Sequence, residues 1–265
     1  MRHPSEGQMN MTRKRFLELS GLSLLAVFAK RAIGSLMAIG GGQAVAQRAP
    51  AIATRWAMVV DPGKCRKKDG CTDCISACHK AHNVPLINDA LHEVKWIWKE
   101  PFENAFPAQE SAYTEVAFQG KPVLVLCNHC DNPPCVRVCP TQATWKREDG
   151  IVMMDWHRCI GCRYCVAACP YGSRSFNWFD PRPYIPALNA GFPTRSKGVV
   201  EKCNFCEERL ALGQSPACVA ACPEKALVFG NLADPQSEVR QLLRSRYTIR
   251  RRPELGTEPN VFYWI

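Results

Sequence analysis

The 265-residue sequence predicts an α+β protein built from two small modules, in which short strands carry cysteine-rich ligand loops and longer insertions lie on the surface. Two observations predict this class. Sixteen cysteines fall in four groups of four, and the segments between the groups are short, rich in β-branched and aromatic residues, and bounded by Gly, Pro or Asp. Apolar residues make up 46% of the chain, which is enough for an ordinary hydrophobic core.

Residues 1–46 predict an export signal. The segment Thr12-Arg13-Lys14-Arg15-Phe16-Leu17 resembles the twin-arginine signal, with lysine in place of the second arginine, and Ala44-Val45-Ala46 is an A-x-A type cleavage site. Lys30 and Arg31 interrupt the apolar stretch between them, whereas a membrane span needs about twenty apolar residues. We therefore expect a twin-arginine-type signal peptide that exports the folded protein to the periplasm; a basic tail is the alternative.

The third cysteine group is the most regular of the four. It reads C-I-G-C-R-Y-C-V-A-A-C-P from Cys159 to Pro170, so three thiolates lie on one tight loop and a fourth follows after three intervening residues. This spacing resembles that of bacterial ferredoxins, in which the fourth cysteine ligates a second [4Fe-4S] cluster. We expect that cysteine to stand at the start of a following helix, with proline fixing the backbone angle after it. Such motifs work in pairs.

The other three groups vary the spacing. Group two reads C-N-H-C-D-N-P-P-C-V-R-V-C-P from Cys127, and group four reads C-N-F-C, then eleven residues long enough for a helical turn, then C-V-A-A-C-P. Group one, C-R-K-K-D-G-C-T-D-C-I-S-A-C-H, is the least regular, because His79 stands where the others have proline. The candidate cluster ligands are Cys65, Cys71, Cys74, Cys78, Cys127, Cys130, Cys135, Cys139, Cys159, Cys162, Cys165, Cys169, Cys203, Cys206, Cys218 and Cys222.

Disulfides and structural zinc are the alternatives for so many cysteines. Disulfide scaffolds are typically short secreted chains, and this chain is long enough to bury a core without eight disulfides. Zinc sites show two C-x-x-C pairs separated by a spacer, which differs from runs of three ending in Cys-Pro. The pattern therefore favours iron-sulfur clusters.

The net charge of +10 fits the same interpretation. Residues 1–46 hold +4 of it, and four clusters with four thiolates each would contribute roughly −8. Basic residues beside the motifs are then expected to compensate cluster charge: Lys64, Arg66, Arg137, Arg158, Arg163 and Lys202. Nucleic-acid binding is disfavoured, because no basic helix or RNA-binding signature is present. Three histidines near the cysteines, His79, His82 and His129, are interpreted as ordinary surface residues, with ligation or proton coupling left open for His79.

Between the cysteines, six segments are predicted as strands: Arg55–Asp61, Val94–Trp98, Tyr113–Phe118, Val123–Leu126, Gly150–Asp155 and Ala226–Phe229. A helix is predicted near the end of the chain, with Asp234 as the capping residue and Pro235 at the first helical position. Val239, Leu242 and Leu243 would form its apolar face.

The chain after the leader resembles the four-cluster iron-sulfur subunits of membrane oxidoreductases. The motifs that carry this resemblance are C-N-H-C-D-N-P-P-C-V-R-V-C-P, C-I-G-C-R-Y-C-V-A-A-C-P-Y-G and K-G-V-V-E-K-C-N-F-C-E-E-R-L. Within that group, the leader together with C-H-K-A-H-N-V-P and H-E-V-K-W-I-W is most similar to the DsrO-type subunits of Dsr complexes in dissimilatory sulfur metabolism.

The resemblance implies four [4Fe-4S] clusters and their ligands. One cluster would take Cys159, Cys162, Cys165 and Cys139, and its neighbour Cys127, Cys130, Cys135 and Cys169. In the other module, Cys222 would join Cys65, Cys71 and Cys74, and Cys78 would join Cys203, Cys206 and Cys218. Residues 120–180 would form one ferredoxin-like module, and residues 47–119 with 181–265 the other.

The implied function is conduction of electrons without catalysis, in the periplasm at the membrane. The resemblance implies two partners, an NrfD-type integral membrane subunit that reacts with quinone and a periplasmic multihaem cytochrome c. A catalytic subunit is disfavoured, since the sequence has no G-x-G-x-x-G, P-loop or C-x-x-C-H motif. The iron-sulfur subunit of a polysulfide, dimethyl sulfoxide or nitrite reductase, of a formate dehydrogenase or of a hydrogenase stays an alternative, as does a free polyferredoxin.

Overall fold

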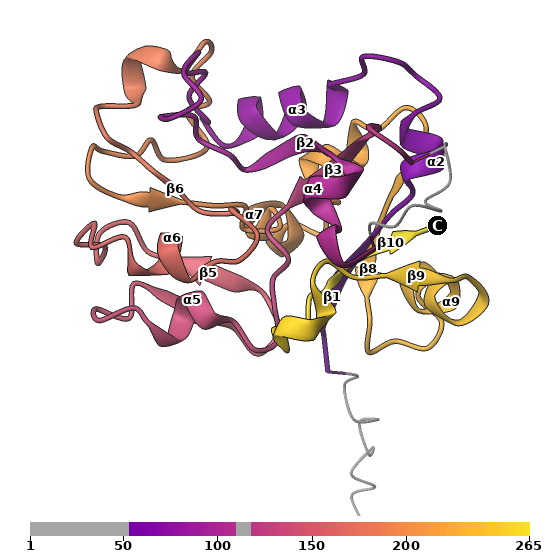
Figure 1. The fold of residues 1–265 in the computed structure, drawn as a ribbon. Helices are drawn as coiled ribbons and strands as arrows, with labels where there is room; N and C mark the ends of the chain where they lie inside the picture. Colours follow the sequence, from indigo (N-terminus) through magenta and orange to yellow (C-terminus); the bar gives the residue numbers. More distant parts are fainter. Residues whose placement is uncertain (1–52, 110–117) are drawn as a thin grey trace, which may run out of the picture. The chain divides into compact units, whose positions relative to one another are not determined.

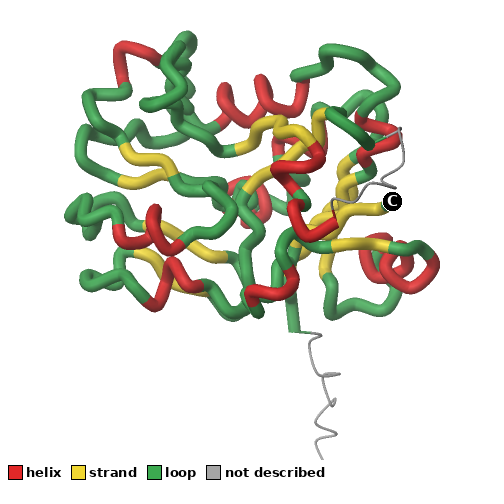
Figure 2. Tube along the Cα trace, in the orientation of Figure 1, coloured by secondary structure: helices red, strands yellow, loops and turns green. Residues whose placement is uncertain are grey.

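The computed structural model describes residues 53–109 and 118–265, as short helices and short strands joined by long loops (Figure 1, Figure 2). The predicted signal peptide at residues 1–46 and all but the last residue of the predicted strand Tyr113–Phe118 lie outside these ranges. Among the described residues, no helix has the length and apolar character needed to cross a membrane. The mixture of helices and strands agrees with the predicted α+β class.

The largest sheet has four strands in the order β8-β1-β10-β9. β1 (Trp56–Val60) pairs antiparallel with β8 (Leu227–Asn231) on one side and parallel with β10 (Val261–Trp264) on the other. β9 (Thr248–Ile249) extends the sheet beyond β10. The first described strand is therefore held between two strands from the end of the chain, which brings these distant segments side by side (Figure 1).

The two faces of this sheet pack against different cores. Ala57 and Val59 point to one face, where they meet Val239 of α9 (Glu238–Ser245). Met58 and Val60 point to the other face and belong to the core that also contains several cysteines. This alternation follows from the two-residue period of a strand, and it explains why all four side chains are buried.

The N-terminus of α9 corrects the predicted cap. Ser237, not Asp234, is the capping residue, and its hydroxyl accepts a hydrogen bond from the Arg240 amide at 3.3 Å. The carboxylate of Asp234 instead accepts from the Gln236 amide at 2.9 Å, and this local turn delays the start of the helix. The predicted apolar face is confirmed, because Val239, Leu242 and Leu243 pack on the sheet.

Three two-stranded antiparallel sheets complete the strands: β2 (Ile97–Pro101) with β3 (Pro122–Leu126), β4 (Thr144–Lys146) with β5 (Val152–Met154), and β6 (Ser175–Phe176) with β7 (Val200–Glu201). The strand predicted at Val94–Trp98 begins three residues later than expected. The strand begins late because the Lys95 amide donates to the Ser175 hydroxyl at 2.7 Å and not to a neighbouring strand.

Short helices carry or adjoin the cysteines: α2 (Pro62–Cys65), α3 (Asp73–Ala81), α5 (Pro134–Arg137), α6 (Tyr164–Ala168), α7 (Glu207–Ala211) and α8 (Ala217–Ala220). α4 (Phe102–Ala105) and three 3-10 turns, Pro107–Gln109, Arg182–Tyr184 and Pro253–Leu255, lie away from them in the sequence. The prediction of a helical turn inside group four is confirmed by α7. The nine-residue α3 was not predicted; it packs against α8, so groups one and four are adjacent.

Candidate iron-sulfur sites

The ligand loops share one local geometry. In groups two, three and four, the third cysteine lies inside a helix of four or five residues: Cys135 in α5, Cys165 in α6 and Cys218 in α8. The fourth cysteine then follows the end of that helix, so the expectation that it begins a following helix is wrong. The helices are too short to reach it, and Cys169, the residue after α6, has extended backbone angles that end the helix.

Site 1 is a cavity lined by Cys65, Cys71, Cys74 and Cys222. The first three come from group one, and Cys222 comes from the end of group four. Burial, together with the charges of Cys65 and Cys222, raises the pKa of the Cys74 thiol to about 12. Four sulfur atoms therefore face a single space whose other walls include Leu124 and Leu227.

Site 2 brings Cys78 of group one to Cys203, Cys206 and Cys218 of group four. Burial raises the pKa of the Cys78 thiol far above its usual range, and the next causes in size are the charges of Cys203, Cys218 and Cys206. All four side chains are buried. Cys78 lies one helical turn after Cys74 on α3, so this helix contributes to both site 1 and site 2.

Site 3 is a cavity lined by Cys127, Cys130, Cys135 and Cys169. It combines three cysteines of group two with the last cysteine of group three. Burial raises the pKa of the Cys130 thiol to about 12, with the charges of Cys127, Cys135 and Cys169 acting in the same direction.

Site 4 combines Cys139, at the end of group two, with the group-three loop from Cys159 through Cys162 to Cys165. Cys139, Cys159 and Cys165 share one apolar cluster, and Cys162 lies on the loop between the last two. Burial opposes ionisation of Cys139, but hydrogen bonds from Thr141 and from the amides of Thr144 and Ala143 outweigh it and lower the pKa of its thiol. Site 4 thus already stabilises one thiolate.

Donors are directed at the sulfur atoms, as expected around iron-sulfur clusters. Backbone amides donate to Sγ of three cysteines: Phe205 to Cys203 at 3.4 Å, Ala217 to Cys206 at 3.3 Å and Ala226 to Cys222 at 3.2 Å. The sites therefore offer sulfur ligands together with the amides that stabilise their negative charge.

Buried Lys and Arg side chains provide a further test of whether the four sites suit iron-sulfur clusters. Four Lys and Arg side chains are buried in the described part of the chain, and two of them form ion pairs with carboxylates, Arg195 with Glu201 and Arg251 with Glu100. Arg174 and Lys202 have no carboxylate partner among the described residues. Arg174 donates to Cys135 Sγ, and Lys202 donates to the carbonyl oxygens of Val152 and Cys203, where its charge lowers the pKa of the Cys203 thiol against the larger effect of burial. A buried charge is costly unless it is compensated, so these two cations fit a cysteine site that carries net negative charge. A [4Fe-4S] cluster with four thiolates carries that charge.

The four sites follow one another in space. After burial, the largest cause that raises the pKa of the Cys203 thiol in site 2 is the charge of Cys127 in site 3. Cys74 of site 1 contributes to the raised pKa of Cys218 in site 2. Cys135 of site 3 contributes to that of Cys165 in site 4, after burial and against the opposing charge of Arg174. The order is therefore site 1, site 2, site 3, site 4.

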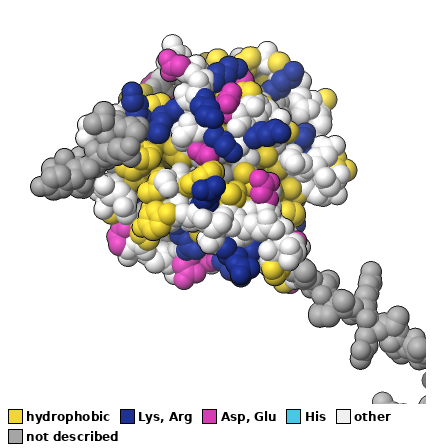
Figure 3. All heavy atoms as spheres, turned by 90° about the vertical axis from the view of Figure 1, so that its right-hand side faces the viewer, with side chains coloured by type: hydrophobic (Ala, Val, Ile, Leu, Met, Phe, Trp, Pro, Cys, Tyr) yellow, Lys and Arg dark blue, Asp and Glu magenta, His cyan; other side chains and the backbone are white. Residues whose placement is uncertain are grey.

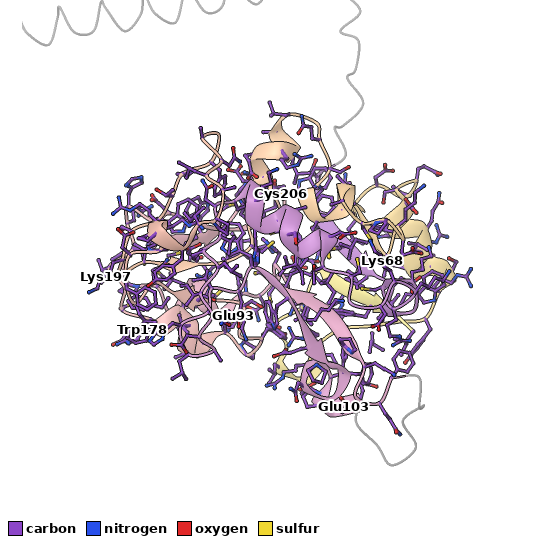
Figure 4. The ribbon with its side chains drawn as sticks, turned by 90° about the horizontal axis from the view of Figure 1, so that it is seen from above. Lys68, Glu93, Glu103, Trp178, Lys197 and Cys206 are labelled. Carbon is purple, nitrogen blue, oxygen red and sulfur yellow. The ribbon has the colours of Figure 1, made fainter. Side chains whose placement is uncertain are left out.

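The exposure of the cysteines distinguishes the two inner sites from the two outer sites. Site 2 is wholly buried, and in site 3 only Cys169 is half-buried, whereas three cysteines are half-buried in each of site 1 and site 4. Figure 4 labels Cys206 of site 2 near the centre, with Lys68 of the site 1 loop on one side and Trp178 on the other. Trp178 belongs to the site 4 end, because the Arg163 guanidinium of the group-three loop stacks over its ring at 4.7 Å.

Two of the histidines interpreted as surface residues are buried. His82 is 1% exposed, its Nε2 lies 2.8 Å from Glu208, and its Nδ1 lies 2.9 Å from the Cys78 carbonyl. Burial disfavours its charged form, but hydrogen bonds with Cys206 and Glu208 outweigh this and raise its pKa to about 9. His129 is fully buried against the ring of Phe205. Only His79 is partly exposed.

The six residues expected to compensate cluster charge differ in burial: one is buried, three are exposed, and Lys64 and Arg66 are half-buried. Lys202 is buried, and its charge lowers the pKa of the Cys203 thiol against the larger effect of burial. Arg137, Arg158 and Arg163 are exposed. Arg174, which the sequence alone did not single out, is buried and donates to Cys135 Sγ at 3.1 Å. The signal that could have found it is the arginine five residues after Cys169, in the P-Y-G-S-R segment that follows the group-three motif.

Comparisons with known proteins agree with this geometry. The 4Fe-4S dicluster domain matches residues 122–181 and 185–232. The iron-sulfur subunit 1 of the Hdr-like menaquinol oxidoreductase of Archaeoglobus fulgidus is 39% identical, over 96% of this chain and 97% of its own length. The iron-sulfur cluster-binding subunit of the menaquinone reductase of Nitratidesulfovibrio vulgaris is 38% identical over 79% of this chain and 88% of its own, and protein NrfC of Escherichia coli is 37% identical over 87% and 90%. The chain belongs to the family of iron-sulfur electron-transfer subunits with 4Fe-4S dicluster domains that serve oxidoreductase complexes.

Proposed function

We propose that the chain relays electrons through four [4Fe-4S] clusters, one at each of sites 1 to 4, in the periplasm. Its partners would be an NrfD-type membrane subunit that reacts with quinone and a periplasmic multihaem cytochrome c, within a Dsr-type complex of dissimilatory sulfur metabolism. The observation that carries the relay is the agreement between order and exposure: the sites run in a line, the two inner ones are the most buried, and the two outer ones are accessible.

The side chains of this chain hold and insulate the carriers. Each cluster supplies uptake and release of one electron, and sixteen thiolates would bind the four of them, as two pairs whose fourth ligands are exchanged. Burial of site 2 excludes water, while amide donors and buried cations stabilise the negative charge there. A protein that only conducts electrons needs to hold and insulate its clusters and needs no further reactive groups. This supports a non-catalytic subunit.

The two ends of the relay differ in surface chemistry, which supports two different partners. The loop at site 1 carries consecutive basic residues, Arg66, Lys67 and Lys68, and Figure 3 shows Lys and Arg side chains spread over this side of the molecule. At site 4 the exposed side chains beside the cysteines include Ile160, 67% exposed, and Tyr164, 62% exposed, together with Arg158 and Arg163. A charged end suits a water-exposed redox protein, and an end that mixes exposed apolar, aromatic and arginine side chains suits a stable subunit interface.

The names of the relatives support the quinone partner. Two of them are subunits of enzymes named for menaquinol or menaquinone, so menaquinol is the quinone that we propose for the complex. The export signal predicted in residues 1–46 supports the periplasmic location. A relative from Halobacterium salinarum, named as a candidate iron-sulfur component of a dimethyl sulfoxide reductase, is 38% identical over 79% of both chains. It favours the corresponding component of such a reductase as the second candidate.

Iron and zinc quantification with redox-titrated EPR tests the four clusters. Protein assembled in the cytoplasm should contain about sixteen irons per chain, from four cubanes, and no stoichiometric zinc. Eight irons or fewer, with zinc in the remainder, would overturn the proposal. Purification from membranes with and without detergent tests the subunit role: we expect recovery with a membrane protein in detergent, and recovery as a lone soluble protein would contradict it.

A further inference from the structure

Arg174 lies at the junction between site 3 and site 4. Its Nη2 donates to Cys135 Sγ of site 3 at 3.1 Å and to the Thr144 hydroxyl at 2.7 Å, while Nη1 lies 3.5 Å from Met154 Sδ. Met154 belongs to the apolar cluster that also contains Cys139, Cys159 and Cys165 of site 4. The guanidinium thus contacts a cysteine of site 3 directly and a side chain that packs with the cysteines of site 4.

No carboxylate among the described residues neutralises Arg174, so its positive charge acts on the neighbouring cysteines. The residue is 4% exposed, and no carboxylate in the described ranges forms an ion pair with it. Its Nε is also buried without a hydrogen-bond partner there. Arg195 is similarly buried but is neutralised by Glu201 at 2.7 Å. A buried cation without a carboxylate acts with full effect on neighbouring charges, because water and salt screen it little.

We propose that Arg174 is a shared tuning residue that raises the midpoint potentials of the clusters at sites 3 and 4 together. This inference rests on the proposed function, since it requires clusters at both sites. One-electron reduction adds one negative charge to a cluster, and a nearby buried cation stabilises the reduced form more than the oxidised form. Because one guanidinium lies beside both sites, it shifts the two potentials in the same direction. Sites 1 and 2 lie beyond its contacts and are not affected.

Three variants test the proposal by redox-titrated EPR of the intact, iron-loaded chain. Arg174→Met removes the charge and keeps much of the side-chain volume, and Arg174→Lys keeps the charge without the planar fork. The matched control is Lys146→Met, which removes an equal charge from a more exposed position whose pKa responds to Cys130 of site 3. Cys130→Ser and Cys162→Ser assign the signals of sites 3 and 4.

In Arg174→Met the potentials of sites 3 and 4 should both fall, by at least a tenfold change in the one-electron equilibrium constant, about 59 mV. The potentials of sites 1 and 2 should stay at the wild-type values. Arg174→Lys should shift sites 3 and 4 less than Arg174→Met does. Lys146→Met should shift them by a smaller amount that disappears at high salt, whereas the Arg174→Met shift should persist.

The outcomes separate this inference from the proposed function. Wild-type protein without four clusters would contradict the proposed function. Four clusters in the wild type with unchanged potentials in Arg174→Met, or a shift confined to one site, would overturn the shared tuning role. Should Arg174→Met and Arg174→Lys both lose the iron of sites 3 and 4 while sites 1 and 2 keep theirs, Arg174 holds the clusters in place and does not tune them, which also overturns the proposal.

Discussion

The guanidinium of Arg195 forms an ion pair with Glu201 at 2.7 Å, and both side chains are completely buried. Arg195 also donates to the carbonyl oxygens of His82 at 2.5 Å and Asn83 at 2.7 Å, just after α3. Glu201 in turn accepts from Trp96 Nε1 at 3.0 Å. Arg195 belongs to a proline-rich insertion, residues 180–197. The contacts of Arg195 fix this insertion to the segment after α3, the helix that contributes to sites 1 and 2, and to the strand before Cys203.

Removal of this arginine should destabilise the fold strongly. Arg195→Met leaves Glu201 buried and uncompensated, so we expect the free energy of unfolding to fall by about 3–5 kcal/mol. Urea denaturation of the iron-loaded protein, followed by tryptophan fluorescence, measures this. Arg182→Met is the matched control in the same insertion, because its ion pair with Asp180 is exposed and its loss should change stability little. Equal effects of the two variants would contradict the assigned role.

Exchange of the fourth ligands between groups predicts where single cysteine variants act. Cys222→Ser alters the end of group four, yet it should disturb the cluster bound by the group-one cysteines, since Cys222 lines site 1. Cys78→Ser should do the reverse and disturb the cluster held by group four. EPR of the two variants, with iron counts one to four atoms below the wild type, checks this. A change confined to the variant's own group would show that the groups bind clusters independently.

The spacing of the cysteines is local, so the sequence alone predicts which of them share a loop, while their role as cluster ligands stays a prediction. Three cysteines on one loop and a Cys-Pro after them follow from spacing alone, and the structure places Cys127, Cys130 and Cys135 around one cavity with Cys169. The strand at Val123–Leu126 and the apolar face of α9 were also predictable, since each depends on a short periodic pattern. The division into two modules stays a prediction.

What the sequence could not predict depends on long-range contacts. His82 was interpreted as a surface histidine, and only the packing of α3 against the group-four segment buries it beside Glu208. Arg174 resembles any surface arginine in the sequence, because its importance arises from Cys135, thirty-nine residues earlier. The cap of α9 was misplaced for a local reason, since Asp and Ser both cap helices and Asp234 forms a turn instead.

Gly161 makes a close approach that a side chain would prevent. It has φ +70°, and a Cβ atom added there would collide with the carbonyl oxygen of Gly198. Gly161→Ala should therefore displace the loop between Cys159 and Cys162 and cost about four irons, one cubane, from site 4. Gly172→Ala is the matched control, because Gly172 has φ +63° with no atom within 4 Å of the added Cβ. Iron content and the site 4 EPR signal measure the difference, and equal losses in both variants would attribute the effect to backbone strain alone.

The order of the four sites predicts which clusters interact magnetically when all are reduced. Cys203 of site 2 lies near Cys127 of site 3, and Cys74 of site 1 lies near Cys218 of site 2. Loss of the site 2 cluster, for example in Cys206→Ser, should therefore simplify the EPR spectra of both site 1 and site 3 and leave site 4 unchanged.

The matched comparison for this order is loss of the cluster at an end of the line. Cys162→Ser should remove the interaction between site 4 and site 3 only, because site 4 has a single neighbour. That neighbour is site 3: after burial, and against the opposing charge of Arg174, its Cys135 contributes to the raised pKa of the Cys165 thiol. Spectra of the fully reduced variants, recorded at several temperatures, distinguish the two patterns. A Cys206→Ser protein in which site 4 changes as much as site 3 would require a branched arrangement. Electrons could then enter and leave without passing through the buried site 2, and the exposure of the outer sites would no longer mark the ends of a relay.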